Sequence, residues 1–113
     1  MYTIKKEYRK NGNLSIIRYF FNNKLIERKI FHPSKGYLRY YNKFKNNKKH
    51  GKQFEYYLED DLTHKFCYIE NYKNGLMHGD QYFDYPFNNS IDFYKCYNGK
   101  IEGIEIKSHE FKN

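Results

Sequence analysis

Hydrophobic and polar residues alternate along short stretches of this chain, and turn sequences separate the stretches. The segments Gln53-Phe54-Glu55-Tyr56 and Ile104-Glu105-Ile106-Lys107 show the alternation, which is typical of half-buried β-strands. Turn sequences rich in Asn and Gly recur every 10 to 15 residues along the chain. No segment combines a helical period with capping residues. The pattern therefore predicts short antiparallel strands joined by tight turns.

The turn sequences belong to an internal repeat. Its copies open at Phe20, Phe44, Tyr72 and Cys96, which stand 24, 28 and 24 residues apart. Two and three positions later, the last three copies carry the turn pairs Asn46 and Asn47, Asn74 and Gly75, and Asn98 and Gly99. Asn and Gly tolerate the positive φ angles that a type I′ hairpin needs. A period of this size predicts stacked copies of one hairpin unit.

Two further columns of the repeat predict a bulge and an inward-facing side chain. Seven positions after the opening residue, the last three copies carry Gly51, Gly79 and Gly103, and a Gly inside a strand marks a bulge or a close backbone approach. Ten positions after it, every copy is apolar, at Ile30, Phe54, Tyr82 and Ile106. We expect these four residues to form the core together with Phe20, Phe44 and Tyr72.

Consecutive hairpins without long crossovers form a meander. We therefore predict an all-β fold, a single-layer twisted antiparallel sheet of stacked hairpins, in one domain that covers residues 1–113 with about four copies of a 24-residue unit. The first copy is degenerate, because Glu27 stands where the other copies have Gly. A degenerate first copy suits the role of a capping repeat at the end of the stack. The extra residues from Glu59 to Phe66 predict a longer loop. A meander leaves an open edge at each end, so we also expect that a homodimer can form through a sheet edge, with Ile104 and Ile106 on the last strand.

The phrase Tyr-x-Asn-Gly-x-x-His-Gly-x-x-Tyr resembles a MORN (membrane occupation and recognition nexus) repeat. It is complete in residues 72–82 and nearly complete in residues 44–54. The resemblance covers residues 8 to 107 and is closest to the variant repeats of bacterial antitoxin-like and viral proteins. Cys96 and Glu102 depart from the pattern in the last copy. The resemblance implies a sheet of stacked hairpins without enzymatic activity, which acts as a scaffold, a dimerisation module or a docking surface, with phospholipid binding or an antitoxin role as further options.

Composition adds a strong positive charge to this picture. The formal net charge is +8, with 14 Tyr and 10 Phe but no Ala or Val. Such a charge favours a nucleic-acid or anionic-membrane partner, although AT-rich coding also enriches Lys over Arg. Two unpatterned cysteines, Cys67 and Cys96, indicate a reducing compartment. The first residues lack the apolar segment of a secretory signal, so we expect a cytoplasmic protein.

Candidate catalytic and metal-binding residues are few. His50 and His78 share one repeat column, which Glu102 extends, and they could hold a metal or pack beside the Gly that follows. His64 and Cys67 could form a nucleophile and base, yet residues three apart in a strand face opposite sides. We therefore expect no enzyme, no metal, no cofactor and no small-molecule substrate.

The strongest functional lead is a set of aromatic residues interleaved with lysines. The candidate binding face consists of Tyr40, Lys45, Lys48, Lys49, Lys52, Tyr56 and Tyr57. Such a face can dock a protein through Tyr anchors, stack bases while Lys holds phosphates, or contact acidic lipid headgroups. Alternatively, one Tyr of each neighbouring pair belongs to the core and the other is a solvated residue of the sheet surface. We expect a non-catalytic scaffold that binds a protein partner through an aromatic face or an open edge. The alternatives are a binder of anionic lipid or nucleic acid, and an antitoxin or inhibitor that masks an enzyme.

Overall fold

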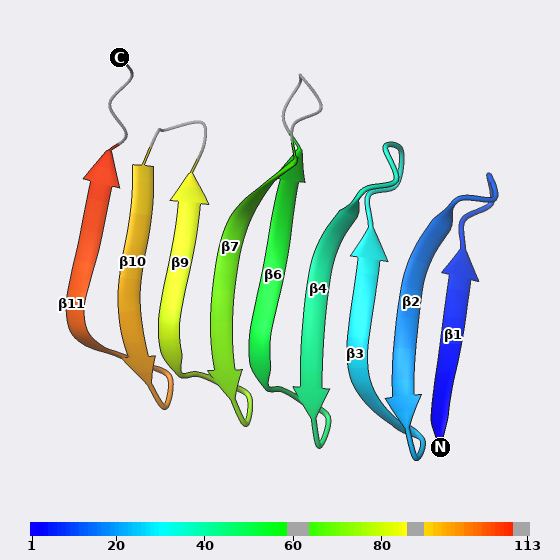
Figure 1. The fold of residues 1–113 in the computed structure, drawn as a ribbon, viewed down its shortest axis with the longest axis horizontal. Coiled ribbons are helices and arrows are strands. Elements are labelled where there is room, and N and C mark those ends of the chain that lie inside the picture. Colours follow the sequence, from blue (N-terminus) through cyan, green and yellow to red (C-terminus); the bar gives the residue numbers. More distant parts are fainter. Residues whose placement is uncertain (59–63, 86–89, 110–113) are drawn as a thin grey trace.

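A computed structural model describes the backbone of residues 1–58, 64–85 and 90–109, and the side chains of residues 1–56, 68–84 and 91–102. The described residues contain no helix and form one open antiparallel sheet (Figure 1). Its strands are β1 (Tyr2–Tyr8), β2 (Leu14–Phe21), β3 (Lys24–Phe31), β4 (Leu38–Lys45), β5 (Lys48–Lys49), β6 (Gly51–Leu58), β7 (His64–Lys73), β8 (Leu76–Met77), β9 (Gly79–Tyr85), β10 (Ser90–Tyr97) and β11 (Lys100–His109).

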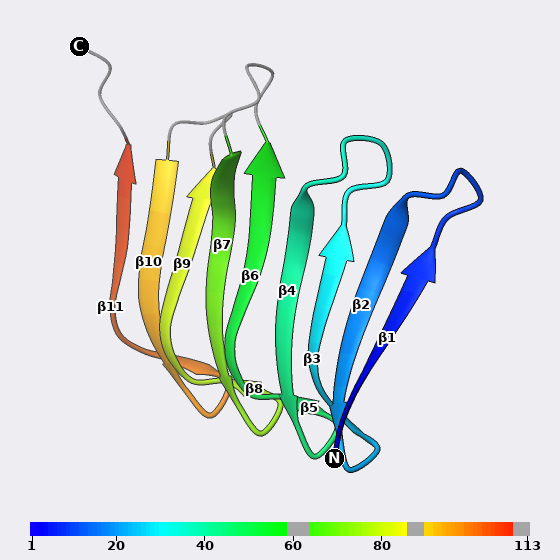
Figure 2. The same ribbon diagram turned by 45° about the vertical axis from the view of Figure 1, so that its right-hand side comes forward.

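The main strands follow one another across the sheet in chain order, from β1 to β11. The short strands β5 and β8 pair only with β4 and β7 and lie near the lower end of the sheet (Figure 2). The strands also turn progressively from one edge to the other in this view. The predicted all-β meander of hairpins is confirmed.

The tight turns at the lower end have the backbone conformation that their sequences predict. Positive φ angles occur at both central residues of each turn, at Asn22 and Asn23, Asn46 and Asn47, Asn74 and Gly75, and Asn98 and Gly99. Two positive φ angles in succession give the type I′ turn, whose twist matches that of the flanking strands. The local sequence is therefore sufficient to set these four reversals of the chain.

The glycines that stand seven positions after the opening residue of a copy let the strands bend after the hairpins. Gly51 has a φ of 86° and Gly79 a φ of 94°, a region in which an L side chain is strained. The residue before each Gly still pairs with the strand across the hairpin, because the N–H groups of His50 and His78 donate to Lys43 O at 3.0 Å and Asn71 O at 2.8 Å. From the Gly onward the chain pairs with the following strand, and three residues after the Gly it pairs again with the strand across the hairpin. Gly103 lies outside the residues whose surroundings are described.

Two buried glutamines bridge the gap that each bend leaves. The Gln81 side chain donates from Nε2 to Asn71 O at 2.9 Å and accepts from Asn71 N at 2.9 Å on Oε1. Gln53 makes the same pair of bonds with Lys43 O and N, at 2.9 and 3.1 Å. Each carboxamide thus replaces the backbone peptide that would normally lie opposite in the ladder. The bends therefore cost the sheet few hydrogen bonds.

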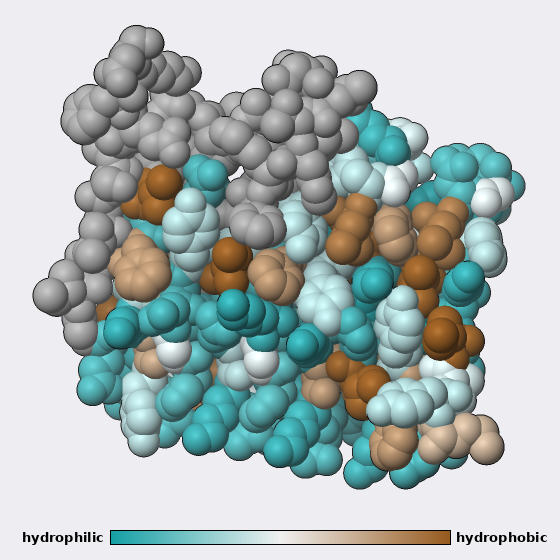
Figure 3. Space-filling view, viewed as in Figure 1, coloured by the Kyte–Doolittle hydropathy of each residue, from teal (hydrophilic) through white to brown (hydrophobic). Residues whose placement is uncertain are grey.

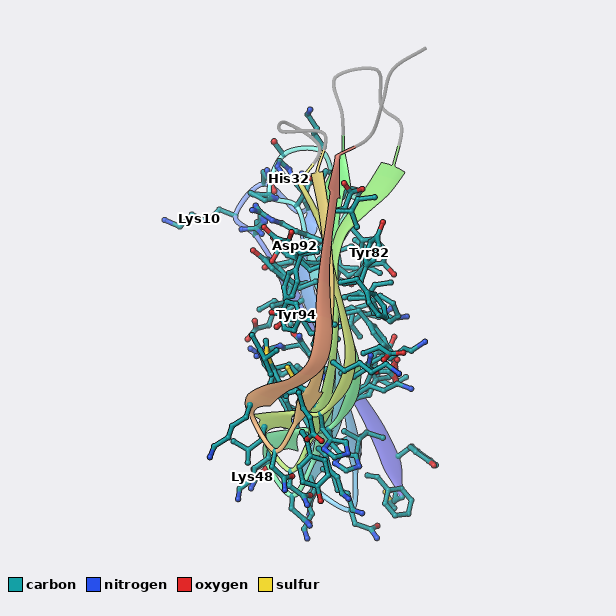
Figure 4. The ribbon with its side chains drawn as sticks, turned by 90° about the vertical axis from the view of Figure 1, so that its left-hand side faces the viewer. Lys10, His32, Lys48, Tyr82, Asp92 and Tyr94 are labelled. Carbon is teal, nitrogen blue, oxygen red and sulfur yellow. The ribbon has the colours of Figure 1, made fainter. Side chains whose placement is uncertain are left out.

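The sheet is a single layer with two solvent-facing sides. Its dimensions are 45 × 37 × 16 Å. Tyr82 lies on one side and Tyr94 and Asp92 lie on the other (Figure 4), and we name these sides the Tyr82 face and the Tyr94 face. Among described residues, Cys96 is the only buried hydrophobic one. The predicted core is therefore a set of half-buried rows on both faces, because no second layer of described residues covers either of them.

One predicted core residue lies on the opposite face from its repeat equivalents. Phe54, Tyr82 and Ile106 align in one row of directly paired residues, through Ile69 and Phe93. Ile30 instead pairs with Tyr40, which pairs with Glu55. The first copy has one extra residue after its turn, whereas the second and third copies have two. A slip of one residue turns the following side chains to the other face, so the expectation for Ile30 was wrong.

Candidate functional site

The Tyr82 face carries a row of aromatic and aliphatic side chains across the strands. Direct cross-strand pairing places these residues in order as Ile17, Lys29, Tyr41, Phe54, Ile69, Tyr82 and Phe93. We name them the Tyr82-face row. All are half-buried. Figure 3 shows this face, with apolar side chains across its middle and upper part, hydrophilic ones over its lower left and centre, and further apolar ones at its lower right.

Ring contacts and one hydrogen bond hold the centre of this row. The Tyr41 and Phe54 ring centroids are 5.7 Å apart, and Phe54 stacks on Tyr56 at 5.9 Å. The Tyr41 hydroxyl donates to the carboxylate of Glu27. Burial, followed by this hydrogen bond, raises the pKa of Tyr41 above its usual value. The centre of the row thus consists of packed rings, which lose little side-chain entropy when a partner binds.

The structure separates the predicted binding residues instead of gathering them. Tyr40 pairs with Glu55, so it lies on the opposite face from Tyr41, Phe54 and Tyr56. The lysines divide as well, with Lys45 and Lys48 exposed beside a hairpin turn. The predicted single binding face was therefore wrong, because residues adjacent in sequence point to alternate sides of a strand.

The remaining members of that set occupy different surroundings. The Lys49 ammonium lies 5.2 Å from the Tyr72 ring centroid, in a cation–π contact. Lys52 pairs with Asn71 in the lower half of the Tyr82 face. Tyr57 and the core residue Ile106 fall outside the residues whose side chains are described.

The two histidines of the repeat fasten the turn of the next copy. Asn74 N–H donates to His50 Nδ1 at 3.2 Å, and Gly75 N–H donates to Lys49 O at 2.8 Å. One copy later, Asn98 and Gly99 donate to His78 Nδ1 and Met77 O at 3.4 and 2.8 Å. The two imidazoles therefore act as acceptors between copies, in matching surroundings. Within the described part of the chain, no cluster of three or more His, Cys, Asp or Glu side chains could hold a metal.

The predicted Cys–His pair, His64 and Cys67, falls outside the described side chains. The other cysteine, Cys96, is 6% exposed, and burial raises the pKa of its thiol. A raised pKa keeps the thiol protonated and unreactive at neutral pH. A hollow of about 360 Å³ beside it is lined by His78, Gly79, Asp80, Lys95, Tyr97 and Glu102. It is shallow and carries both signs of charge.

The lower end of the sheet, where the hairpin turns lie, gathers lysines and exposed apolar side chains. We name it the hairpin end. Its exposed lysines are Lys24, Lys45, Lys48, Lys73 and Lys100. Its exposed large apolar and aromatic residues are Met1, Tyr2, Phe21, Leu76, Tyr97 and Ile101, at 41% to 86% exposure. Of the eight such residues in the described chain, only Ile4 and Tyr8 lie elsewhere.

Sequence reasoning missed the most buried side chains of the described chain. Gln81 is 0% exposed, Gln53 3% and Asn42 7%. A signal was present, because Gln follows the bulge Gly by two positions in both the complete and the nearly complete copy of the phrase. It was overlooked because polar residues are expected on the surface.

Comparison with known proteins assigns this chain to no family. No family model matches the chain, and searches of curated proteins and of solved structures give no significant match. In the described residues, no helix has the length and apolar character required to cross a membrane. The surfaces of the sheet itself are therefore the features that indicate a function.

Proposed function

We propose that this protein is a non-catalytic scaffold that binds a protein partner through the upper half of the Tyr82 face. The observation that supports this most strongly is the Tyr82-face row, which lines up rings and aliphatic side chains across a sheet that no other described part of the chain covers. Aromatic side chains dominate the binding energy of protein interfaces. An apolar face on a single-layer sheet gains most when a second surface covers it.

The chemistry of the surrounding residues indicates an acidic partner. Lys43, Lys52 and Lys95 lie in the lower half of this face, and the whole chain carries a net charge of +8. Like charges repel two copies of the same chain, whereas an acidic surface is attracted and steered onto the face. The proposed partner therefore combines an apolar patch with an acidic rim.

The test compares the same substitution on the two faces. Tyr82→Lys and Tyr94→Lys change half-buried tyrosines on the adjacent strands β9 and β10, which point to opposite sides (Figure 4). Wild-type protein is used to capture a partner from an extract of the native host, and its affinity for both variants is measured by calorimetry. We expect Tyr82→Lys to weaken binding at least 10-fold and Tyr94→Lys to bind normally. Equal binding by both variants, or no capture above bare resin, would contradict the proposal.

A second candidate function rests on the hairpin end. Its five exposed lysines and six exposed apolar or aromatic residues lie together where the hairpin turns are. This arrangement suits contact of the hairpin end with an anionic membrane. Each Lys near such a surface contributes about 1 kcal/mol, and apolar side chains add to this by entering the headgroup region. The same lysines also suit nucleic acid, which lacks an apolar phase for Leu76 and Ile101.

Vesicle sedimentation tests this candidate. Lys48→Gln and Lys10→Gln remove the same charge from opposite ends of the sheet (Figure 4). With vesicles that contain phosphatidylserine, we expect Lys48→Gln to weaken binding about 5-fold, the equivalent of about 1 kcal/mol, and Lys10→Gln to have little effect. Binding to an oligonucleotide but not to vesicles would assign the hairpin end to nucleic acid. Equal losses from both variants would show that only net charge matters.

A further inference from the structure

The Tyr94 face places three cationic side chains directly opposite one another. Lys5 on β1 pairs with Arg18 on β2, and Arg18 pairs with Arg28 on β3. Adjacent strands are about 4.8 Å apart, so the stems of these side chains are neighbours. Like charges in directly opposite positions destabilise a sheet. The three residues therefore form a cationic row on a part of the molecule that the proposed function does not use.

The protein neutralises only part of this charge. Arg18 Nη1 lies 2.9 Å from Glu7 Oε1, and Glu7 is the only carboxylate in an ion pair with the row among the described residues. Arg28 donates from Nε and Nη2 to Asn42 Oδ1 at 3.2 and 3.0 Å, and Asn42 is neutral. Three cations thus share one anionic partner. The row keeps an excess of positive charge.

Aromatic rings lie beside two side chains of the row and strengthen the electric field of its charges. Lys5 Nζ lies 5.3 Å from the Phe20 ring centroid and the Arg28 guanidinium lies 5.2 Å from that of Phe44. Burial and the neighbouring Arg18 lower the pKa of Arg28. Arg18 and Arg28 are half-buried, so partial exclusion of water makes their charges interact more strongly than on an open surface, whereas Lys5 is exposed. An added anion would relieve repulsion that already exists in the folded protein.

We propose that Lys5, Arg18 and Arg28 form a binding site for a phosphate group. Two guanidinium forks suit the oxygen atoms of phosphate, and a lysine adds a point charge. A tetrahedral dianion has oxygen atoms enough to contact side chains from adjacent strands at once, whereas a single carboxylate has only two. The ligand is inorganic phosphate or the phosphate group of a small ester.

The experiment follows thermal unfolding and calorimetric binding of the full chain with inorganic phosphate, against sodium chloride at equal ionic strength. We expect phosphate to raise the melting temperature of the wild type in a saturable manner. Arg28→Gln should weaken phosphate binding at least 10-fold, whereas Lys45→Gln, which removes the same charge at the hairpin end, should bind as the wild type does. Equal losses from both variants, or no difference between phosphate and chloride, would overturn the proposal.

A second measurement keeps the test decisive if Arg28→Gln does not fold. Amide NMR signals of the wild type are followed during phosphate titration. We expect the largest shifts on β1 to β3 around Arg18, and shifts centred on the hairpin end would overturn the proposal. Parallel titrations with glycerol phosphate and adenosine monophosphate distinguish the source of the phosphate group, because tighter binding of the nucleotide shows that a base also contacts the neighbouring rings.

Discussion

Replacing Gln81 by Met tests whether a side chain completes the backbone ladder. Gln81 is fully buried, and its carboxamide holds both the N–H and the C=O of Asn71 at 2.9 Å. It also approaches Gly79 O at 3.3 Å. Met has a similar length and an unbranched chain, so Gln81→Met removes the polar contacts while it largely preserves the packing.

The expected loss follows from the groups that remain unpaired. A buried polar group without a partner costs about 1–3 kcal/mol, and the substitution leaves one such group, the Asn71 N–H, because Asn71 O keeps the hydrogen bond from His78 N–H. Because Asn71 is only half-buried, water relieves part of this cost, while the Met side chain adds some apolar burial. We expect the free energy of unfolding to fall by about 1–2 kcal/mol, a sizeable part of the 5–15 kcal/mol of a typical domain. The melting temperature should fall by about 5–10 °C.

Urea unfolding, followed by circular dichroism, measures this change. Gln53→Met should give a similar loss, because Gln53 makes the equivalent bonds one copy earlier. Asp80→Asn serves as the control, since Asp80 is exposed and its 3.9 Å contact with Lys95 is a weak surface pair. If Gln81→Met changes stability by no more than Asp80→Asn does, the bridging carboxamide is not part of the ladder and the reasoning fails.

Three further predictions concern backbone conformation and titration. Gly79→Ala should destabilise the protein by about 1–3 kcal/mol in urea unfolding, because the φ of Gly79 is 94°. Asn47→Gly should be neutral or stabilising, because the φ of Asn47 is already positive at 63°. Similar effects of both substitutions would refute this reasoning. Burial raises the pKa of Glu55, which shows that the folded state disfavours its carboxylate. Glu55→Gln should therefore stabilise the protein at pH 7 but not at pH 3, where both states are protonated, and a gain that persists at pH 3 would exclude a charge effect. Burial and the Glu70 carboxylate raise the pKa of Tyr72 from 10.0 to about 12, so stability should fall as the pH rises between these values, and a Tyr72→Phe variant that shows the same fall would contradict this assignment.

The arrangement of strands was predictable because it depends on short-range signals. Each hairpin needs only two residues that accept positive φ, and Asn74 with Gly75 supplies them locally. The side of the sheet that each residue occupies was much less predictable. Ile30 was placed incorrectly because the bulge after each turn decides which face the following residues occupy, and the first copy, with Glu27 in place of Gly, has a bulge of a different size. Tyr40 lies apart from Tyr56 because neighbouring residues of a strand point to alternate faces.

The sequence alone determined the all-β hairpin meander, through turn residues and alternating strands that need no distant partner. Only the tertiary structure decided which rings form the Tyr82-face row, that Gln81 is fully buried and that Arg18 lies opposite Arg28. The physical reason is the two-residue period of a strand. One extra residue in a bulge reverses every side chain beyond it, and that count is fixed by pairing between strands rather than by the local sequence.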